Sequence, residues 1–277
     1  AIQSVPFVGE HAKELVVFQR TPSSVDLRGN SPTDPEWAET LTPGWQRQRR
    51  ENFNDILLGV PVEEDLVNDG WTEIFRDLMS VVPTNKEKNP EVTPQEAAEM
   101  AEMADFKKMN GIRQRVDDTV ENEEVADLLK PWYRQFCKRP TFNDEFLPTF
   151  NRENVSLVDT SASKGIDRIT EKGIVANGVE YELDCIIFAT GFEVGTVYTR
   201  RAGFEVTGQD GKTLSEHFSE GLKTFHGFSS HGFPNCFQMG GISQTGASVN
   251  LTSVLDDHAQ HIGYIIKEVL DRGAKYV

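Results

Sequence analysis

The sequence has few cysteines, few basic residues and no long apolar run. Its three cysteines among 277 residues lie far apart, at positions 137, 185 and 236, which is not the pattern of a disulfide framework. No apolar run reaches the roughly eighteen residues of a transmembrane helix. No basic segment followed by an apolar one opens the chain, as it would in a secretory signal. We therefore expect a protein of the reducing cytoplasm.

Basic residues are outnumbered by acidic ones. The chain has 28 Lys and Arg against 44 Asp and Glu, a formal net charge of −16. Nucleic acids and anionic membrane surfaces recruit clustered Lys and Arg, so we expect neither as a partner. The acidic excess is concentrated in residues 29–136, with 23 acidic and 12 basic side chains. The segments on either side are less acidic, so they could still bind an anion.

Several strong catalytic signatures are also missing. The chain contains neither the G-x-G-x-x-G of a dinucleotide-binding turn nor the G-x-S-x-G of a nucleophilic serine. His258 and His261 are three positions apart in a predicted helix, as a metal pair would be, but no third ligand is evident nearby. We therefore expect no metal site.

The apolar pattern predicts different structure in the first, middle and last parts of the chain. Residues 1–20 are typical of a helix followed by a short buried strand, as at the end of a βαβ unit. Residues 29–136 contain many prolines and few strand-like runs, which predicts a mostly helical segment. The helical stretches expected there are Trp45–Leu57, Trp71–Met79, Pro94–Met109 and Asn122–Leu129.

From residue 137 onward the pattern favours β structure. An antiparallel meander is expected around Asn177-Gly178, a pair typical of a type I′ hairpin turn. Asp184–Phe192 is a continuous apolar run that predicts a central parallel strand, and Cys236–Met239 predicts another buried strand. A long helix is expected over Leu251–Arg272, ending near Gly273.

Two pairs of residues have the chemistry of a phosphate site. Arg20-Thr21 follows a predicted strand, where an arginine suits the 2′-phosphate of NADP because guanidinium pairs bidentately with phosphate. Lys138-Arg139 stands where the chain returns from the helical segment, and two adjacent cations there could hold phosphate or an anionic intermediate. A surface arginine in a turn and a solvated basic pair are the structural alternatives.

Two small-residue turns could lie close to a cofactor. Thr190-Gly191 ends the predicted strand and permits close backbone approach. The loop Gly240–Gly246 leads into a helix, whose free N–H groups favour an anion or a polar ring. Both are equally compatible with ordinary structural turns.

Five short strings occur in order along nearly the whole chain. They are Val17–Pro22, Cys137–Pro140, Phe150–Val155, the D-x-x-x-x-A-T-G-F string Asp184–Phe192, and Gly232–Asn235 with the strand and glycine loop that follow. Together they resemble the Baeyer–Villiger monooxygenases, class B flavoprotein enzymes that use FAD, NADPH and O₂.

The resemblance implies a role for each matching residue. Arg20 and Thr21 would hold the 2′-phosphate of NADP, with support from Lys138. Arg139 would lie beside the flavin and stabilise negatively charged peroxyflavin and Criegee intermediates. The residues that would lie near the flavin are Thr190, Gly191, Gly241, Gln244 and Thr245.

The resemblance also implies a fold. It is an α/β flavoprotein with two dinucleotide-binding domains, Rossmann-like and three-layered, here incomplete. Residues 1–28 and 137–183 would belong to the NADP-binding domain, 29–136 would be a helical insertion, and 184–277 would be the second part of the FAD-binding domain. The family's glycine motifs are absent, so we expect an internal fragment whose partner is the missing N-terminal part of the same protein.

The expected reaction converts a ketone and O₂ into an ester or lactone. The fragment alone is expected to be inactive, because it lacks the motif that holds the FAD pyrophosphate. A flavin monooxygenase that oxidises nitrogen or sulfur is an alternative, although the cation pair favours the ketone branch. A non-catalytic truncated module is a further alternative.

Overall fold

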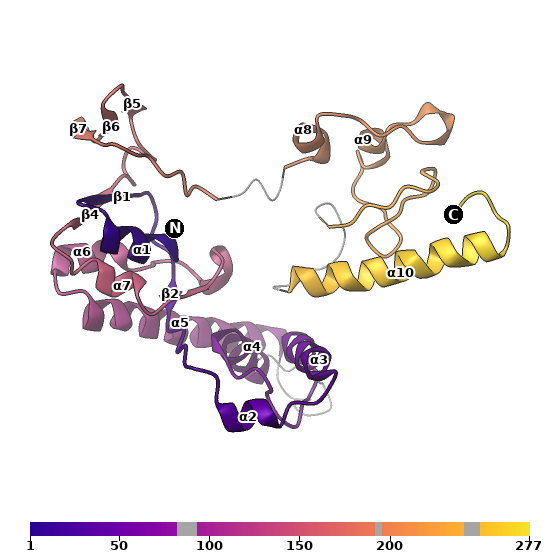
Figure 1. Ribbon diagram of the computed structural model, residues 1–277, viewed down its shortest axis with the longest axis horizontal. Helices are drawn as coiled ribbons and strands as arrows, with labels where there is room; N and C mark the ends of the chain where they lie inside the picture. Colours follow the sequence, from indigo (N-terminus) through magenta and orange to yellow (C-terminus); the bar gives the residue numbers. More distant parts are fainter. Residues whose placement is uncertain (82–92, 192–195, 241–249) are drawn as a thin grey trace. The chain divides into compact units, whose positions relative to one another are not determined.

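The computed structural model describes residues 1–81, 93–191, 196–240 and 250–277, with the side chains of 77–81 excepted. The chain divides into two compact units, Ala1–Ala189 and Thr190–Val277. Figure 1 labels their elements. None of the helices in the described parts combines the length and apolar composition that crossing a membrane requires.

The first unit contains most of the regular structure. Its helices are α1 Ser4–His11, α2 Pro35–Glu39, α3 Trp45–Leu57, α4 Gly70–Val81, α5 Pro94–Thr119, α6 Glu123–Leu129, the 3₁₀ turn η1 Gln135–Cys137 and α7 Phe146–Thr149. Its strands are β1 Leu15–Gln19, β2 Val25–Asp26, β3 Thr141–Phe142, β4 Val155–Asp159, β5 Arg168–Ile169, β6 Gly173–Ala176 and β7 Val179–Glu182.

A helix followed by a strand opens the chain, as the sequence predicts for residues 1–20. β1 pairs in parallel with β4, so that Leu15 lies opposite Val155. The side chain of Asn154 donates hydrogen bonds to the carbonyls of Gly9 and Ala12, each at 2.9 Å. These bonds satisfy carbonyl groups at the end of α1 and so fix the turn into β1. β1 is half-buried rather than fully buried.

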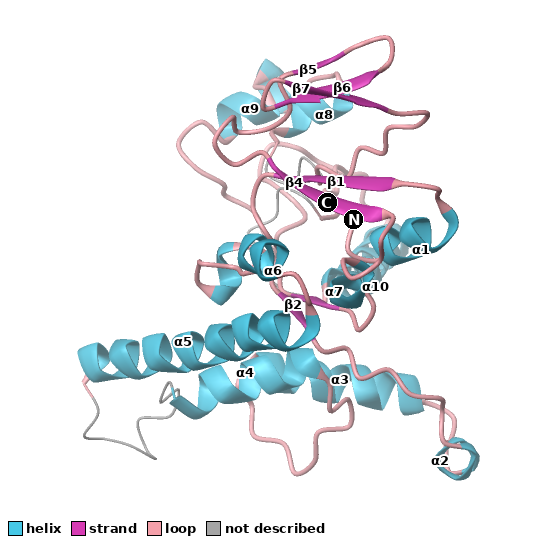
Figure 2. Ribbon diagram, turned by 90° about the vertical axis from the view of Figure 1, so that its left-hand side faces the viewer, coloured by secondary structure: helices cyan, strands magenta, loops and turns pink. Residues whose placement is uncertain are grey.

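Within residues 29–136 the regular structure is helical, and no strand occurs in the described residues of this range. α3, α4 and α5 pack side by side (Figure 2). The bounds of α3 match the prediction, whereas α5 continues ten residues beyond Met109 to Thr119. The buried Met109, Ile112 and Val116 continue one apolar face past Gly111, which explains the extra length. That this segment is an insertion between two parts of one domain stays a prediction.

Polar contacts fix the helical segment to the strands. The Asp144 carboxylate accepts hydrogen bonds from the backbone N–H groups of Arg28, Gly29 and Asn30. Burial alone would raise the pKa of Asp144, but these bonds and the charge of Arg115 lower it below its ordinary value. The start of the helical segment is therefore held by a carboxylate that stays ionised.

One apolar core of the described residues joins the start of the first unit to elements more than a hundred residues later in the chain. It includes residues from α1, β2, α5, α6 and α7, with β1 and β4 packed against it. Side chains far apart in sequence thus bury one another, which is the main stabilising contribution. The buried members are Val5, Val25, Val116, Val120, Ala126, Leu129, Phe146, Leu147 and Phe150.

The predicted antiparallel meander is present as β5, β6 and β7. Asn177 and Gly178 both have positive φ, 51° and 76°, as the type I′ turn requires. The largest parallel sheet in the described residues has two strands. A three-layered Rossmann arrangement therefore stays a prediction.

Two predicted strands are wrong. Residues 184–191 form no strand, and Ile187 and Phe188 are 62% and 69% exposed. Cys236–Met239 is also irregular. A strand needs a neighbour for its backbone hydrogen bonds, and no strand of the described residues runs beside either segment. Both segments are rich in apolar residues, but apolar composition alone does not supply a neighbouring strand.

The second unit is built around one long helix. Its elements are α8 Tyr198–Ala202, the 3₁₀ turn η2 Gln209–Gly211, α9 Leu214–His217 and α10 Leu251–Asp271. α10 confirms the predicted C-terminal helix, and Gly273 follows it with a φ of 61°. The short α9 was not predicted, although Thr213 and Glu216 form a capping box that is visible in the sequence.

Candidate functional site

The loop after β1 is held by one phenol. The Tyr133 hydroxyl donates a hydrogen bond to the carbonyl of Pro22 and accepts one from the N–H of Ser24, both at 2.9 Å. Burial is the largest influence on this hydroxyl and raises the pKa of Tyr133, so it remains a neutral donor. The chain that follows Arg20 is thereby fixed beside Tyr133.

A second loop begins at η1 and carries Lys138 and Arg139. The N–H of Gln135 donates to the Asp105 carboxylate at 2.9 Å, which ties η1 to α5. Gln135 itself is buried, with 2% exposure. This attachment places the two cations at the end of a rigid turn rather than on a free loop.

Lys138 links the two loops. Its Nζ donates a hydrogen bond to the carbonyl of Thr21 at 3.2 Å and lies 5.6 Å from the centroid of the Tyr133 ring. Burial and the nearby positive charge of Arg20 lower the pKa of Lys138. The structure therefore brings together Arg20, Thr21 and Lys138, the three residues that the family resemblance assigns to one phosphate. That they hold a phosphate stays a prediction.

Arg139 is exposed, and its guanidinium lies over an aromatic ring. The distance from Cζ to the centroid of the Trp71 ring, on α4, is 5.9 Å. No sequence pattern indicates this contact, because the apolar spacing predicts Trp71 only as part of a helix. The ring comes from the middle of the acidic segment 29–136, and the cation follows the end of that segment.

Among the described residues, the cations of this site have no acidic partner. Within residues 1–81, 93–191, 196–240 and 250–277, no carboxylate forms an ion pair with Arg20, Lys138 or Arg139. By contrast, Lys108 and Lys130 each contact two carboxylates. In a chain of net charge −16, an unneutralised cluster of cations is a site suited to an anion.

The predicted flavin residues belong to the second unit or fall outside the described residues. Thr190 and Gly191 are exposed. Gly191 has a φ of 95°, and a Cβ there would meet no atom within 4 Å. The backbone is thus open to a flat ring on that side. Gly241, Gln244 and Thr245 lie outside the described residues.

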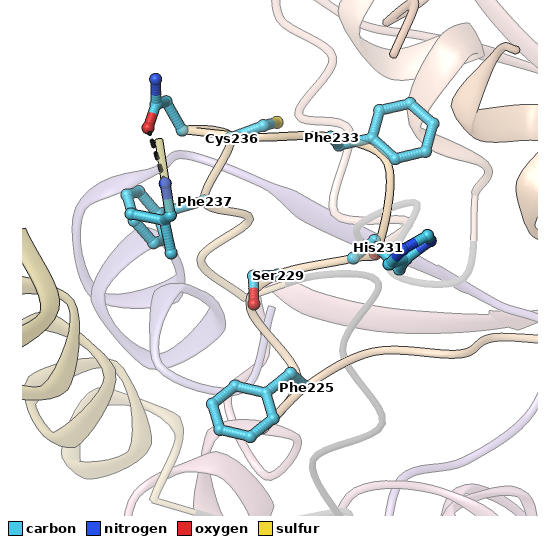
Figure 3. A pocket seen from close by; sticks show the side chains of 9 residues that line it. Phe225, Ser229, His231, Phe233, Cys236 and Phe237 are labelled. Atoms are coloured by element: carbon cyan, nitrogen blue, oxygen red, sulfur yellow. Dashed lines mark hydrogen bonds between the residues drawn. The ribbon is translucent and has the colours of Figure 1, made fainter. Parts of the chain in front are cut away.

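The second unit also contains a pocket of about 250 Å³ that sequence reasoning missed (Figure 3). Aromatic residues make up much of its lining, and Asn235 accepts a hydrogen bond from the N–H of Val277 at 3.3 Å. The lining residues are Phe225, Ser229, Ser230, His231, Phe233, Asn235, Cys236, Phe237 and Val277.

His258 and His261 pack in an aromatic cluster. Both rings contact Phe228, with centroid distances of 5.3 Å and 5.1 Å, and Phe228 is fully buried. No group of three or more metal-ligating side chains occurs in the part of the chain that the structure describes.

Comparison with known proteins gives the family. No family model matches the chain. Neopentalenolactone D synthase of Streptomyces avermitilis is 47% identical over 279 residues, covering 100% of this chain and 46% of the relative. Baeyer-Villiger monooxygenase ATR8 of Stachybotrys chlorohalonatus is 48% identical, covering 100% of this chain and 44% of the relative. The chain belongs to the Baeyer–Villiger monooxygenase family. It spans slightly less than half the length of these relatives.

Two of the proteins that this chain resembles have a cofactor in their names or descriptions. The FAD-binding monooxygenase hmp7 of Hypomyces subiculosus is 42% identical over 277 residues, covering 100% of this chain and 45% of the relative. The polycyclic ketone monooxygenase of Thermothelomyces thermophila superposes with a TM-score of 0.83 at 40% identity, covering 98% of this chain and 44% of that one. An oxidised steroid monooxygenase bound to NADP gives a TM-score of 0.72 at 26% identity, covering 99% of this chain and 52% of that one. The likeness of this chain to both structures fits a two-domain flavoprotein fold.

Proposed function

We propose that the chain is part of an FAD- and NADPH-dependent enzyme that inserts an oxygen atom next to a ketone carbonyl. The product is an ester or lactone. One atom of O₂ enters the carbon–carbon bond beside the carbonyl, and the other leaves as water with the hydride of NADPH (two electrons and one proton) and a second proton from solvent. The observation that supports this most is that Arg20 and Lys138 lie close together in an acidic chain, with Arg139 next to Lys138 in sequence, and that none of the three pairs with a carboxylate of the described residues. The names of the relatives support the ketone as substrate.

Arg20 and Lys138 together suit the adenosine end of NADPH. Arg20 and Thr21 follow β1, and Lys138 is hydrogen-bonded to the carbonyl of Thr21. A 2′-phosphate placed between Arg20 and Lys138 would neutralise the two positive charges that now repel each other. The same residues offer little to NADH, which has no phosphate there.

Arg139 supplies the other charge. When bound, FAD and NADPH supply the hydride transfer and the activation of O₂. Arg139 lies outside any ion pair of the described residues, so its guanidinium charge is available to oxygen that becomes negative during the reaction. Thr190 and Gly191 provide a backbone edge that a flavin ring can approach.

Selective loss of NADPH binding tests the phosphate site. In the purified flavin-containing enzyme that carries this chain, Arg20→Ala and Lys138→Ala are expected to raise the KM for NADPH about 10- to 100-fold, as expected for a charge-assisted hydrogen bond. The KM for NADH should not change. Lys13→Ala, an exposed cation before β1 rather than after it, is the matched control. Equal effects on both nucleotides would show that the variants disturb the fold instead.

Product analysis tests the reaction. The enzyme is incubated with ¹⁸O₂, NADPH and a cyclic ketone, and in parallel with an amine and a sulfide. We expect a lactone that carries one ¹⁸O atom. Formation of only the N-oxide or sulfoxide would favour heteroatom oxidation, and a flavin-loaded protein that oxidises none of these substrates would favour a non-catalytic role.

We further propose that residues 1–277 have no monooxygenase activity when they are produced alone. The sequence has no G-x-G-x-x-G turn, whose backbone N–H groups hold a cofactor pyrophosphate in dinucleotide-binding folds. The chain produced alone should therefore be colourless and inactive with NADPH. A yellow protein with a bound-flavin absorption spectrum would refute this.

A further inference from the structure

The backbone of Trp71 is fixed at the start of α4. The Asp69 carboxylate accepts hydrogen bonds from the N–H groups of Trp71 and Thr72, at 2.9 Å and 3.2 Å, and so caps the helix. Thr72 is fully buried, and Ile74 is 2% exposed, so this first turn of α4 is anchored in the protein interior. Trp71 therefore projects from a rigid element.

The ring of Trp71 contacts two residues that lie three positions apart in the chain, Arg139 and Phe142. It packs edge-on against Phe142, with ring centroids 5.2 Å apart, and it lies 5.9 Å from the guanidinium carbon of Arg139. Phe142 lies in β3, and its ring packs closely against the backbone of Gly70, where an added Cβ would stand 2.2 Å from the ring. The indole is thus oriented by Phe142 and faces Arg139.

A second ring contact lies one helical turn further along α4. Phe75 packs against Phe136 of η1, with centroids 5.7 Å apart. Residues four apart in a helix share a face. α4 therefore presents two aromatic rings to the cation-bearing loop, of which Trp71 contacts Arg139 and Phe75 contacts Phe136.

We propose that Trp71 is a positioning residue for Arg139. The inference rests on the proposed function, in which the guanidinium stabilises negative charge on the transferred oxygen. A carboxylate could also restrain an arginine, but it would neutralise the charge that the reaction needs. An indole ring attracts the guanidinium through its quadrupole and consumes neither its charge nor all its N–H donors. The residue thus keeps Arg139 ordered and available for the anion.

The test compares two substitutions on the same helix face of the flavin-containing enzyme. Trp71→Leu is expected to lower kcat for ester formation about two- to fivefold, the range of a surface cation–π contact. NADPH oxidation should continue, with its electrons and two protons converting O₂ to hydrogen peroxide, so the ester formed per NADPH falls. The KM for NADPH should not change. Trp71→Phe, which keeps a weaker π face, should restore part of the coupling.

Phe75→Leu is the matched control. It removes an aromatic ring from the same face without touching Arg139, so coupling should remain near that of the unmodified enzyme. Equal loss of coupling in Trp71→Leu and Phe75→Leu, or unchanged coupling in Trp71→Leu, would overturn the inference. Thermal unfolding of each variant separates loss of stability from loss of positioning.

A double-mutant cycle separates this inference from the proposed function. Arg139→Ala should abolish most ester formation, and adding Trp71→Leu to it should have little further effect. If Arg139→Ala keeps full ester formation, the role proposed for Arg139 fails. If Arg139→Ala is inactive but Trp71→Leu is fully coupled, only the positioning role of Trp71 fails.

Discussion

The hydroxyl of Tyr133 accepts a hydrogen bond from the backbone N–H of Ser24, with 2.9 Å between oxygen and nitrogen. Ser24 is 1% exposed, so its N–H has no ready replacement partner in water. We expect Tyr133→Phe to lower the free energy of unfolding by about 1–3 kcal/mol, the cost of an unsatisfied buried donor. Urea unfolding measures it. The KM for NADPH should rise as well, because the loop after Arg20 loses its anchor; an unchanged KM would show that the loop is held by other contacts.

The pH dependence of kcat/KM for NADPH should report the loss of the proton from Lys138. Burial and the positive charge of Arg20 lower its pKa, so Lys138 loses its proton at a lower pH than an ordinary lysine. We expect kcat/KM for NADPH to fall as pH rises through that lowered pKa. Arg20→Ala removes a like charge and should move the fall to higher pH, while Lys138→Gln should abolish it. A fall in Lys138→Gln identical to that of the unmodified enzyme would assign the titration to another group.

Lys108 joins β2 to α4, because its Nζ lies 2.7 Å from Asp26 and 2.9 Å from Glu73. Burial favours a lower pKa, but the hydrogen bonds to Asp26 and Glu73 outweigh it and raise the pKa of Lys108 above its ordinary value of 10.5. Since the folded-state pKa is the higher one, the stabilisation is complete below pH 10.5 and is lost as pH rises through the folded-state value.

The corresponding variant is Lys108→Met, with the exposed Lys107→Met as control. We expect Lys108→Met to reduce the free energy of unfolding by about 1–3 kcal/mol at neutral pH, because it leaves two carboxylates without their cation. Lys107→Met should change it little. Denaturant unfolding at pH 7 gives both values, and equal losses would refute a specific role for the Lys108 cluster.

Two glycines on helices should respond oppositely to alanine. Gly70→Ala places a methyl group 2.2 Å from the Phe142 ring, which the aromatic cluster holds in place. We expect a loss of about 1–3 kcal/mol in the free energy of unfolding, typical of overpacking. Gly111→Ala meets no atom within 4 Å and should stabilise the protein by about 0.5–1 kcal/mol through helix propensity. Thermal unfolding of the two variants compares them directly.

Local patterns predicted the helices and the small meander well, because their signals lie within a few residues. The prolines and Thr93 mark the start of α5, and Asn177-Gly178 marks the hairpin turn. The predicted helix ends at Met109, ten residues before the end of α5, because the prediction does not include the buried residues Ile112 and Val116 beyond Gly111. Residues 184–191 were assigned to a strand on composition alone, and composition does not tell whether a neighbouring strand is available.

The candidate site was predictable only in part. The sequence marks Arg20 as a cation after a predicted strand and Lys138 as part of a cation pair where the chain returns from the helical segment, and the structure brings the two together. Trp71 was not predictable, since its contact with Arg139 depends on how α4 folds back over β3. Tyr133 was missed for the same reason, because the partners of its hydroxyl lie more than a hundred positions earlier in the chain.

The parallel pairing of β1 with β4 has a consequence for the order of events in folding. Everything from β2 to α7 lies between the two strands in sequence, so their pairing closes a long loop. Closing a longer loop adds little to its equilibrium free-energy cost, but pairing of distant segments slows folding. We therefore expect α3, α5 and α6 to form early from local contacts. The bond between Lys138 and Thr21 should form late, so that recovery of nucleotide binding during refolding would lag behind recovery of helix.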